Sequence, residues 1–588
     1  MSKTRRSGAG ALGLLLTAAL GGCADHQAGG NADPAHPRLV VMIVVDQLRQ
    51  DYLTRLRSQF TPSTRSAPGG FRWFTDRGAE FTSAHYNHFP LYTGPGHATV
   101  LTGGYPYKTG IVANDWWSAA ERKPVYCVDD PTTAHTGVFG GDTEPMSARN
   151  LRCTTVGDEL KLATGGQAKV VSVALKDRAA ILMAGRLADA VVWYDPLSGN
   201  WVSSKAYGPQ LPAWAAEVNG RKLPDAERGR PWKPLLTSDQ MLPFGAFSIA
   251  PGGGLERQPQ LAFAQAINDK VGESGPGFYK TFTFLPAANE FTFETAEAAV
   301  QAEGLGRHET PDLLAISLSS NDYVGHLYGA NSHEALDFTL RTDRALGQFL
   351  AFLEGWVPGG LSRCTLALTA DHGSSPAPEM MAKLGFPAGQ IDGQKLASTV
   401  AASLSRHFGK PFKGVAGGWA LSRLLPQLDA GPSPTVGVVW IEPYLTIEPK
   451  GLAAAGLDAE LAADEAAKAV AAVEGVYGAW PTHRLLAGQV PPTDLGQRLA
   501  RAVYPGVSGS VLVVLNQLWL AADPAYYTSH GQPYAYDSAV PLLLGGWGVK
   551  PGVYRGPASP NDLAPTFSQL LGILPPSACE GQALAALR

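Results

Sequence analysis

Four stretches of continuous apolar residues constrain the fold of this chain more than any other feature. The runs RLVVMIVV, AKVVSVAL, DLLAISLSS and CTLALTA are rich in Val, Ile and Leu and lack the alternation of a half-buried strand. Such runs are typical of strands buried on both faces of a parallel sheet. Helical patterns such as SHEALDFTLRTDRALGQFLAFLEGW lie between them. The chain is therefore predicted to form an α/β fold, in which helices sandwich a mostly parallel central sheet.

Each apolar run leads directly into polar residues that could carry chemistry. These are Asp46 after the first run, Lys176, Asp177 and Arg178 after the second, Asn321 and Asp322 after the third, and Asp371 and His372 after the fourth. In an open parallel α/β sheet, ligands bind outside the carboxyl ends of the strands. We therefore expect the four segments to present these side chains at one edge of one sheet.

The composition excludes several classes of protein. The chain has 588 residues, of which 45% are hydrophobic and 17% charged, and its formal net charge is -4. These values are typical of a globular protein and not of a disordered or fibrous one. No cluster of Lys and Arg occurs beyond the N-terminus, so we expect no nucleic-acid partner.

The first residues resemble an export signal. A basic segment, MSKTRRSGAG, precedes the apolar run ALGLLLTAAL, and GGC follows. The run is too short to span a bilayer as a folded helix. This order predicts a lipoprotein-type signal peptide at 1–22, an acylated Cys23 and a polar tether at 23–37. A secretory signal cleaved nearby is the alternative. Either way we expect export, to the periplasm or as a lipoprotein anchored in the outer membrane.

Export makes disulfide bonds plausible among the remaining cysteines, which are Cys127, Cys153, Cys364 and Cys579. Four cysteines allow three pairings, and proximity in the sequence favours Cys127–Cys153. Four buried thiols are the alternative. None has the CxxC spacing of a zinc or redox site.

The chain is predicted to consist of one catalytic core with insertions. The core comprises residues 38–375 and 528–588, and an irregular insertion rich in Pro and Gly lies at about 205–310. Residues 376–527 combine an Ala-rich helical pattern with separate strand-like runs, which predicts an inserted α+β lobe.

Carboxylates and imidazoles suited to metal binding occur at the expected strand ends and near the end of the core. They are Asp46, Asp322, His326, Asp371, His372 and His530. Each alone is weak evidence, because an Asp-His pair is often an ordinary loop contact. Together they are the mixed oxygen and nitrogen ligands that Zn²⁺ accepts. Two such metals would hold the attacking and leaving oxygens of a phosphoryl displacement.

The segment TGPGHATVLTG offers a nucleophile. Thr93 precedes Gly-Pro-Gly at the expected start of a helix, where free N–H groups and the helix dipole favour an anion. Tyr92 is its rival in position. Thr99 and Thr102 lie inside or at the end of the helix, as expected for packing residues. The histidines His85, His88 and His97 are expected to be core or supporting residues and not ligands.

Cationic and amide side chains could bind a phosphoryl group. Lys176 and Arg178 stand two apart where a strand is expected to end, so both can point to the same side. An ammonium and a planar guanidinium suit phosphate oxygens. Asn114 could donate its amide to the same group. Asp177 is expected to face away and to be structural. Alone, the pair could be an ordinary charged strand end.

Taken together, these segments resemble the alkaline phosphatase superfamily, and most closely the exported bacterial alkaline phosphatases with a threonine nucleophile, relatives of the nucleotide pyrophosphatase/phosphodiesterase branch. The shared motifs are VVDQLRQDYL, FPLYTGPGHATVLTG, GIVANDWW, LKDRAA, SSNDYVGHLYG, TADHG and SHG. The resemblance implies a phospho-threonine on Thr93 and two Zn²⁺. It assigns Asp322, His326 and His530 to one zinc and Asp46, Asp371, His372 and the Thr93 oxygen to the other. It assigns Asn114, Lys176 and Arg178 to the phosphoryl oxygens.

The predicted activity is hydrolysis of small phosphate monoesters by a monomeric enzyme. Lys176 and Arg178 favour monoesters, because a dianionic phosphoryl group has more oxygens than two metals satisfy. The alternatives are a phosphodiesterase, nucleotide pyrophosphatase or phosphonate hydrolase with the same metals, and a non-catalytic lipoprotein that binds phosphate or metal. Mn²⁺ or Co²⁺ could replace zinc. An additional structural Ca²⁺ could bind the Asp-rich loop CVDDPTT.

Overall fold

The computed structural model describes residues 36–64, 67–133, 145–245, 263–417, 435–523 and 526–588. The predicted signal peptide, Cys23 and most of the predicted tether lie outside these residues. Within the described parts of the chain, no helix is both long and apolar enough to cross a membrane.

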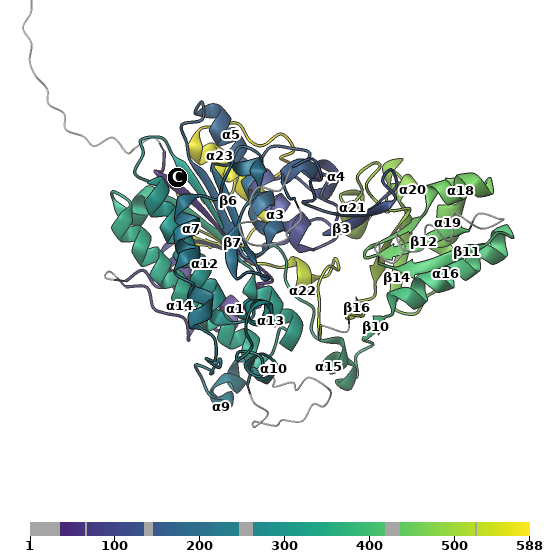
Figure 1. Ribbon diagram of the computed structural model, residues 1–588, viewed down its shortest axis with the longest axis horizontal. Helices are drawn as coiled ribbons and strands as arrows, with labels where there is room; N and C mark the ends of the chain where they lie inside the picture. The colour runs from purple at the N-terminus through teal and green to yellow at the C-terminus, as the bar shows by residue number, and fades with distance from the viewer. Residues whose placement is uncertain (1–35, 65–66, 134–144, 246–262, 418–434, 524–525) are drawn as a thin grey trace, which may run out of the picture. The chain divides into compact units, whose positions relative to one another are not determined.

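A nine-stranded sheet forms the core of residues 36–588 (Figure 1). Its strands, in spatial order, are β18 (Gly552–Tyr554), β2 (Ala79–Phe81), β17 (Leu542–Gly546), β9 (Cys364–Thr369), β1 (Leu39–Val45), β8 (Asp312–Leu318), β5 (Val170–Ala174), β6 (Ala190–Asp195) and β7 (Asn200–Val202). From β9 to β6 all neighbours are parallel, whereas β17 and β7 pair antiparallel with the strands beside them. The predicted mostly parallel sheet is confirmed.

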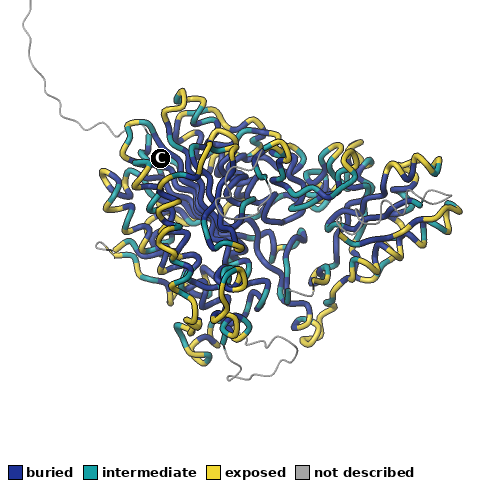
Figure 2. Tube along the Cα trace, in the orientation of Figure 1, coloured by how far each residue is buried: buried dark blue, intermediate teal, exposed yellow. Residues whose placement is uncertain are grey.

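Helices cover both faces of this sheet because its central strands are apolar on both sides. On β1, Val41 and Ile43 pack in one hydrophobic cluster, and Val40 and Met42 pack in another. The first cluster includes residues of α7 (Ala213–Gly220), α12 (Pro286–Glu303) and α14 (His333–Trp356). The second includes residues of α3 (Thr93–Thr102), α5 (Val156–Ala163), α6 (Asp177–Ala184) and α23 (Leu563–Leu571). Figure 2 accordingly shows the strands as buried and the outer helices as partly exposed.

The Pro- and Gly-rich stretch after residue 205 contains several short helices before α12. They are α8 (Leu223–Ala226), α9 (Ser238–Met241), α10 (Gln265–Asn268) and α11 (Pro276–Phe282). Phe278 and Phe282 of α11 are buried in the first hydrophobic cluster. These helices therefore extend the cover over one face of the main sheet.

A separate five-stranded sheet belongs to the inserted lobe. Its order is β11 (Phe412–Ala416), β12 (Val436–Ile441), β13 (Tyr444–Ile447), β15 (Val511–Leu515) and β14 (Val476–Pro481). Only β11 and β12 are parallel, and the other neighbours are antiparallel. The helices α16 (Gly393–Phe408) and α19 (Ala459–Ala471) pack on it around a third hydrophobic cluster. The inserted α+β lobe of the predicted fold class is therefore confirmed.

A β-hairpin leads away from the segment after α3. Its strands are β3 (Asp115–Ser118) and β4 (Lys123–Tyr126). Trp117 is buried against Val415, Val439 and Ile441 of the lobe sheet, and Trp116 is buried in the second cluster of the core. Both tryptophans therefore pack.

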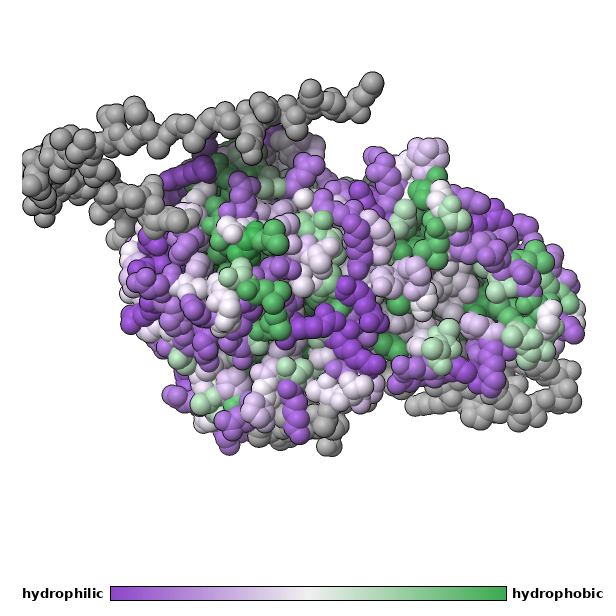
Figure 3. All heavy atoms as spheres, turned by 90° about the horizontal axis from the view of Figure 1, so that it is seen from above, coloured by the Kyte–Doolittle hydropathy of each residue, from purple (hydrophilic) through white to green (hydrophobic). Residues whose placement is uncertain are grey.

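On the face drawn in Figure 3, polar and apolar residues are interspersed in small patches. The cysteines Cys127, Cys153, Cys364 and Cys579 are all free thiols, so the pairing Cys127–Cys153 that proximity favoured is wrong. The Cys127 sulfur instead lies close to the start of α3, because a Cβ added to Gly94 would lie 3.2 Å from it. Burial raises the pKa of the Cys127 thiol well above its usual value, so the thiol stays protonated.

Candidate active site

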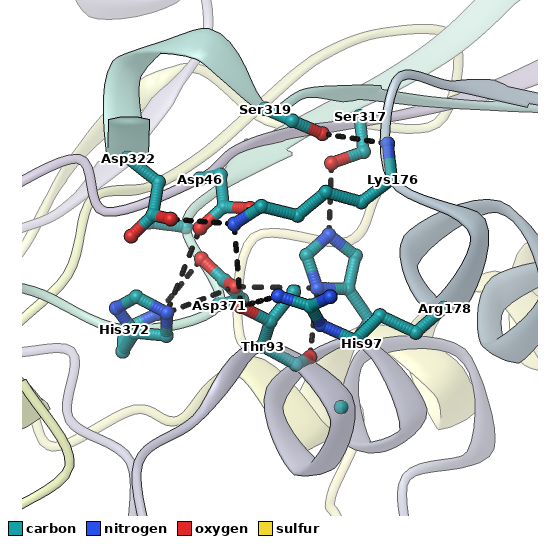
Figure 4. A network of polar contacts seen from close by, with 12 residues as sticks. Asp46, Thr93, His97, Lys176, Arg178, Ser317, Ser319, Asp322, Asp371 and His372 are labelled. Atoms are coloured by element: carbon teal, nitrogen blue, oxygen red, sulfur yellow. Dashed lines mark hydrogen bonds and ion pairs between the residues drawn. The ribbon is translucent and has the colours of Figure 1, made fainter. Parts of the chain in front are cut away.

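Four adjacent parallel strands deliver their following residues to one edge of the main sheet. The strands β9, β1, β8 and β5 are neighbours in that order, and each leads into polar side chains. Asp371 follows β9, Asp46 follows β1, Asp322 follows β8 and Lys176 follows β5. Figure 4 shows that these four side chains point toward one another. The convergence follows from strand direction, because parallel strands end at the same edge.

Two compact groups of metal-ligand side chains form at this edge. Asp46, Asp371 and His372 hold ligand atoms within 4.8 Å of one another, and so do Asp322, His372 and His530. All are buried, and His372 belongs to both groups. His326, in α13 (Ser320–Tyr328), lies outside this second compact set, although its Nε2 is 3.1 Å from Asp322 Oδ1.

The backbone fixes the orientation of three imidazoles. His326 Nδ1 is 2.8 Å from the Thr528 carbonyl oxygen, His372 Nδ1 is 2.9 Å from that of Gly373, and His530 Nδ1 is 2.8 Å from that of Leu91. A carbonyl oxygen only accepts, so each Nδ1 carries the proton and donates it. Each Nε2 then faces a carboxylate oxygen of Asp322 or Asp371. Metal-binding histidines are characteristically held in this way.

The buried side chains of the first group fit a divalent cation. Among the described residues, Asp46 Oδ1, Asp371 Oδ2 and His372 Nε2 are buried without a well-aligned hydrogen bond, and His372 Nε2 lies 3.5 Å from the first oxygen and 3.2 Å from the second. Burial, and next the charge of Asp371, raise the pKa of Asp46 to about 7. Although burial opposes protonation of His372, Asp371 raises the pKa of that imidazole to about 9. Buried oxygen and nitrogen atoms that lie close together and lack well-aligned hydrogen bonds suit a metal ion.

Thr93 is the first residue of α3, and its side chain is 1% exposed. Its Oγ1 lies 3.4 Å from Lys176 Nζ and 3.4 Å from Arg178 Nη2. Behind it, the Gly94 N–H donates to Asn114 Oδ1 at 2.8 Å. The side-chain oxygen of Asn114 accepts this bond, so the NH2 group of the same amide is the part that can donate to a ligand. The hydroxyl is therefore set at a helix N-terminus among cationic donors.

The other hydroxyls of this segment have different surroundings. The Tyr92 hydroxyl lies beside the lobe carboxyl of Glu442 without forming a well-aligned hydrogen bond. Burial, and next that carboxyl, raise the pKa of Tyr92 well above its usual value, so it stays a neutral phenol. Thr102 donates to the Ala98 carbonyl at 2.6 Å, as a packing residue inside a helix does.

His97 connects helix α3 to the segment after β9. Its Nδ1 is 2.9 Å from the Thr93 carbonyl oxygen and 3.2 Å from Asp371 Oδ2, and its Nε2 is 2.8 Å from Ser317 Oγ. Figure 4 shows it between these groups. The backbones also meet closely here, because a Cβ on Gly96 would lie only 2.4 Å from the Asp371 carbonyl oxygen. The position of Thr93 relative to Asp371 is thus determined by direct packing.

The structure places Lys176 and Arg178 differently from the expected strand end. β5 already ends at Ala174; Lys176 is the N-cap of α6, and Arg178 lies in the first turn of that helix. Lys176 Nζ is 2.7 Å from Asp46 Oδ2 and 2.6 Å from Asp322 Oδ2. Although burial disfavours the ammonium, Asp322 and Asp46 raise the pKa of Lys176, which therefore stays charged.

Asp177 contacts the β3–β4 hairpin. Its Oδ1 accepts a hydrogen bond from the Tyr126 hydroxyl at 2.5 Å, and Arg178 Nη1 in turn donates to that hydroxyl at 3.0 Å. Sequence reasoning missed Tyr126, because nothing in the hairpin sequence KPVY marks its last residue as a neighbour of Arg178. It also missed Glu442, whose carboxylate accepts from Gln532 Nε2 at 3.0 Å.

The Asp-rich loop considered for Ca²⁺ is closed by protein donors. Asp130 Oδ2 accepts from Ser147 Oγ at 2.6 Å, and Asp130 Oδ1 accepts from the Thr132 N–H at 3.0 Å. Although burial opposes the shift, these hydrogen bonds and a further one from Thr133 lower the pKa of Asp130 to about 2. A Ca²⁺ in this loop stays a prediction.

Comparison with known proteins gives this arrangement a family. Residues 40–407 match the model of type I phosphodiesterase / nucleotide pyrophosphatase. The alkaline phosphatase PhoV of Synechococcus elongatus is 31% identical over 554 residues, covering 94% of this chain and 93% of its own. The alkaline phosphatase PafA of Elizabethkingia meningoseptica is 30% identical, with 94% of both chains covered.

A solved structure of wild-type PafA superposes on this chain with a TM-score of 0.81. The identity is 30%, and the match covers 95% of this chain and 100% of the other. A PafA variant with one threonine, one asparagine, one lysine and one arginine substituted also matches with a TM-score of 0.81. Its identity is 28%, over 95% of this chain and 100% of that one.

The fold, the paired ligand groups and these matches define a hydrolase of the alkaline phosphatase type. The chain belongs to the type I phosphodiesterase/nucleotide pyrophosphatase family. The family and the class of enzyme predicted from the sequence are confirmed.

Proposed function

We propose that the protein hydrolyses phosphate monoesters through a phospho-threonine formed on Thr93, at a centre that holds two zinc ions. One observation carries the proposal. His326, His372 and His530 are each anchored through Nδ1 to a backbone carbonyl, so that Nε2 faces the buried carboxylates. Imidazoles oriented in this way suit metal ligands.

The ligands divide into two sets in this proposal. Asp322, His326 and His530 would hold one ion, and Asp46, Asp371, His372 and Thr93 Oγ1 would hold the other. Mixed nitrogen and oxygen donors of this kind favour zinc. When bound, the two ions stabilise negative charge on the attacking and leaving oxygens.

The chain's own residues perform the rest of the reaction. Thr93 Oγ1 attacks phosphorus, a new P–O bond forms, and the bond to the leaving oxygen breaks. Water then cleaves the phospho-threonine, so that the net products are the alcohol and inorganic phosphate. The N-terminal N–H groups of α3 and the cations of Lys176 and Arg178 stabilise the phosphoryl charge during both steps.

The preference for monoesters rests on Lys176, Arg178 and Asn114. A monoester has three non-bridging oxygens and two negative charges, whereas a diester has one charge and a second bulky substituent. Two charged donors stand 3.4 Å from Thr93 Oγ1, close enough to meet a phosphoryl group bound there. Such donors stabilise the more highly charged substrate more strongly.

The spacing of the substituted PafA residues supports these assignments. The four substitutions in that variant stand 21, 62 and 2 residues apart. Thr93, Asn114, Lys176 and Arg178 have the same types and the same separations in this sequence.

The proposal extends to location and organisation. We propose export under a signal at 1–22, anchoring through an acylated Cys23, and action as a monomer on small phosphate esters. The catalytic unit would comprise residues 38–375 and 528–588, with 376–527 as the inserted lobe. The basic and apolar order of the first residues supports the export part.

Diester hydrolysis is the second candidate, and the match of residues 40–407 to a phosphodiesterase family favours it. The same metal ligands would serve both reactions. The two differ in whether Lys176 and Arg178 contribute to the rate.

The test is a metal analysis combined with two chromogenic substrates, nitrophenyl phosphate and its methyl diester. We expect two zinc ions per chain and a higher kcat/KM for the monoester. Thr93→Ala should lower turnover of the monoester at least about 10³-fold, because the nucleophile is lost, with metal content and folding retained. Wild-type turnover by Thr93→Ala would refute the nucleophile. A zinc-loaded wild type that cleaves neither substrate would indicate a binding protein.

A further inference from the structure

The Tyr126 hydroxyl connects the Arg178 guanidinium to the Asp177 carboxylate. Its hydroxyl donates to Asp177 Oδ1 at 2.5 Å and accepts from Arg178 Nη1 at 3.0 Å. The same Asp177 oxygen accepts the backbone N–H of Arg178 at 2.5 Å. The contacts therefore close a ring of hydrogen bonds around the start of α6.

The direction of these hydrogen bonds fixes the orientation of the Arg178 guanidinium. A phenol has one proton, which goes to the carboxylate, so the phenol oxygen turns its lone pairs toward Arg178. With Nη1 held in this way, Nη2 lies 3.4 Å from Thr93 Oγ1. Among the described residues, Arg178 Nε has no hydrogen-bond partner. The hydroxyl of Tyr126 is thus the side-chain acceptor that sets which end of the guanidinium faces the nucleophile.

The β3–β4 hairpin brings this tyrosine to the site. Asp115 and Tyr126 are paired at the base of the hairpin, and just outside it the Cys127 N–H donates to the Asn114 carbonyl oxygen at 2.8 Å. Asn114 Oδ1 accepts from Gly94 at the nucleophile, and Tyr126 meets Arg178. One hairpin therefore contributes to both sides of the expected phosphoryl position. Its tip is fixed by Trp117, which packs against lobe residues.

The charges around Arg178 keep these groups in their required states. Burial, opposed by the neighbouring Arg178, raises the pKa of Tyr126 well above its usual value, so the phenol keeps the proton that it donates. Although burial disfavours the guanidinium, Tyr126 and Asp177 raise the pKa of Arg178 further. The Asp115 carboxyl also interacts with the Arg178 guanidinium, and burial raises the pKa of Asp115 to about 6.

We propose that Tyr126, held by Asp177, is a positioning residue that aims the Arg178 guanidinium at the phosphoryl oxygens and thereby contributes to the preference for dianionic monoesters. The inference rests on the proposed function, which assigns Arg178 to the phosphoryl group. Tyr126 acts through Arg178 and touches no reacting atom in this scheme.

The test is Tyr126→Phe, which keeps the ring and removes the hydroxyl. We expect kcat/KM for nitrophenyl phosphate to fall about 10- to 100-fold, because a misdirected donor loses most of its effect, while the methyl diester changes less than about twofold. The matched control is Tyr207→Phe, since the Tyr207 hydroxyl donates to the Gly185 carbonyl at 3.1 Å, outside this set of contacts. Both activities of the control should stay within about twofold.

A double-mutant cycle separates positioning from a general structural role. In an Arg178→Ala background, Tyr126→Phe should cause no further loss of monoester hydrolysis. Equal losses for monoester and diester, or an additive loss in the Arg178→Ala background, would overturn the inference.

The cycle also separates failure of this inference from failure of the proposed function. If Arg178→Ala alone leaves the ratio of monoester to diester hydrolysis unchanged, the assignment of Arg178 is wrong and both fall. If Arg178→Ala changes the ratio and Tyr126→Phe does not, only the role of Tyr126 is refuted.

Discussion

The two large sheets of this molecule have similar strands and different tasks. In both, buried apolar strands lead into polar residues: Asp46 follows β1 in the core, and Glu442 and Glu448 follow β12 and β13 in the lobe. The core strands are parallel, so their carboxyl ends gather at one edge. β12 and β13 are antiparallel, so their following carboxylates lie at opposite ends. Strand direction, more than composition, determines where chemistry can assemble.

The fate of Glu448 illustrates the difference. Its carboxylate accepts from the Gly451 N–H at the start of α18 (Pro449–Ala455) and pairs with Arg122 Nε at 3.0 Å. It is therefore a helix cap in the lobe. Glu442, at the opposite end of the sheet, contacts Gln532 and approaches Tyr92, which precedes Thr93. The last lobe residues reach the same site, because Tyr526 stacks on His326 with ring centroids 4.4 Å apart.

The largest effect should come from the core edge. Asp371→Asn should lower kcat/KM for the monoester by at least about 10³-fold and reduce the metal content, because a buried ligand loses its charge. Asp464→Asn, on helix α19 of the lobe, is the control and should leave both values unchanged. Metal analysis and steady-state kinetics check this. Comparable losses in the two variants would remove the distinction between the sheets.

Next in size is the joint removal of Lys176 and Arg178. The double alanine variant should lose about 10²- to 10³-fold in monoester turnover, since two cationic donors at the phosphoryl group are lost. Hydrolysis of the methyl diester should fall much less. Parallel assays of the two substrates measure the ratio. Equal losses of monoester and diester hydrolysis would contradict the proposal that Lys176 and Arg178 recognise the dianionic phosphoryl group.

A smaller effect is expected where the lobe meets the core. Burial raises the pKa of Glu442 to about 7, so near neutrality much of this carboxyl is protonated. Gln532 stands two residues after His530, and Tyr92 directly precedes Thr93. Loss of the Glu442 contacts should therefore disturb both site residues, so Glu442→Ala should lower kcat about 10-fold. Glu442→Gln replaces the carboxyl by an uncharged group of the same shape and should restore most of the activity. If both variants behave alike, the contact does not position the site.

The smallest effect on catalysis should come from the lobe interior. Leu445 is fully buried in the third hydrophobic cluster. Leu445→Ala should lower the free energy of unfolding by about 2–5 kcal/mol through loss of packing. Activity per folded molecule should stay within about twofold. Chemical denaturation and an assay corrected for folded protein test this. A large loss of kcat at full folding would show that the lobe does more than stabilise.

The main sheet and its edge could be predicted from sequence because both depend on local patterns. Unbroken apolar runs specify strands buried on two faces, and the residues after them must then lie at the strand ends. The positions of Asp46, Asp322 and Asp371 at the sheet edge follow from this rule. The position of Thr93 at the start of a helix follows from the Gly-Pro-Gly segment after it.

The remaining contacts depend on distant packing that no local pattern encodes. Tyr126 meets Arg178 only because a hairpin pairs Asp115 with Tyr126. Glu442 resembles Glu448 in its sequence setting, and only strand direction separates them. Lys176 and Arg178 were expected on a strand, because AKVVSVAL does not reveal that β5 ends at Ala174 and that α6 starts three residues later.

The close approach of Gly96 to Asp371 has a consequence for how this enzyme can change. Any side chain at position 96 would meet the Asp371 carbonyl oxygen and push α3 away from the turn after β9. A shift of about 1 Å is enough to spoil an in-line attack. The side chain at Thr93, which we propose as the nucleophile, or the residues of the lobe can be exchanged without altering this close approach. The spacing between helix and strand offers no such freedom, because it is set by a missing side chain.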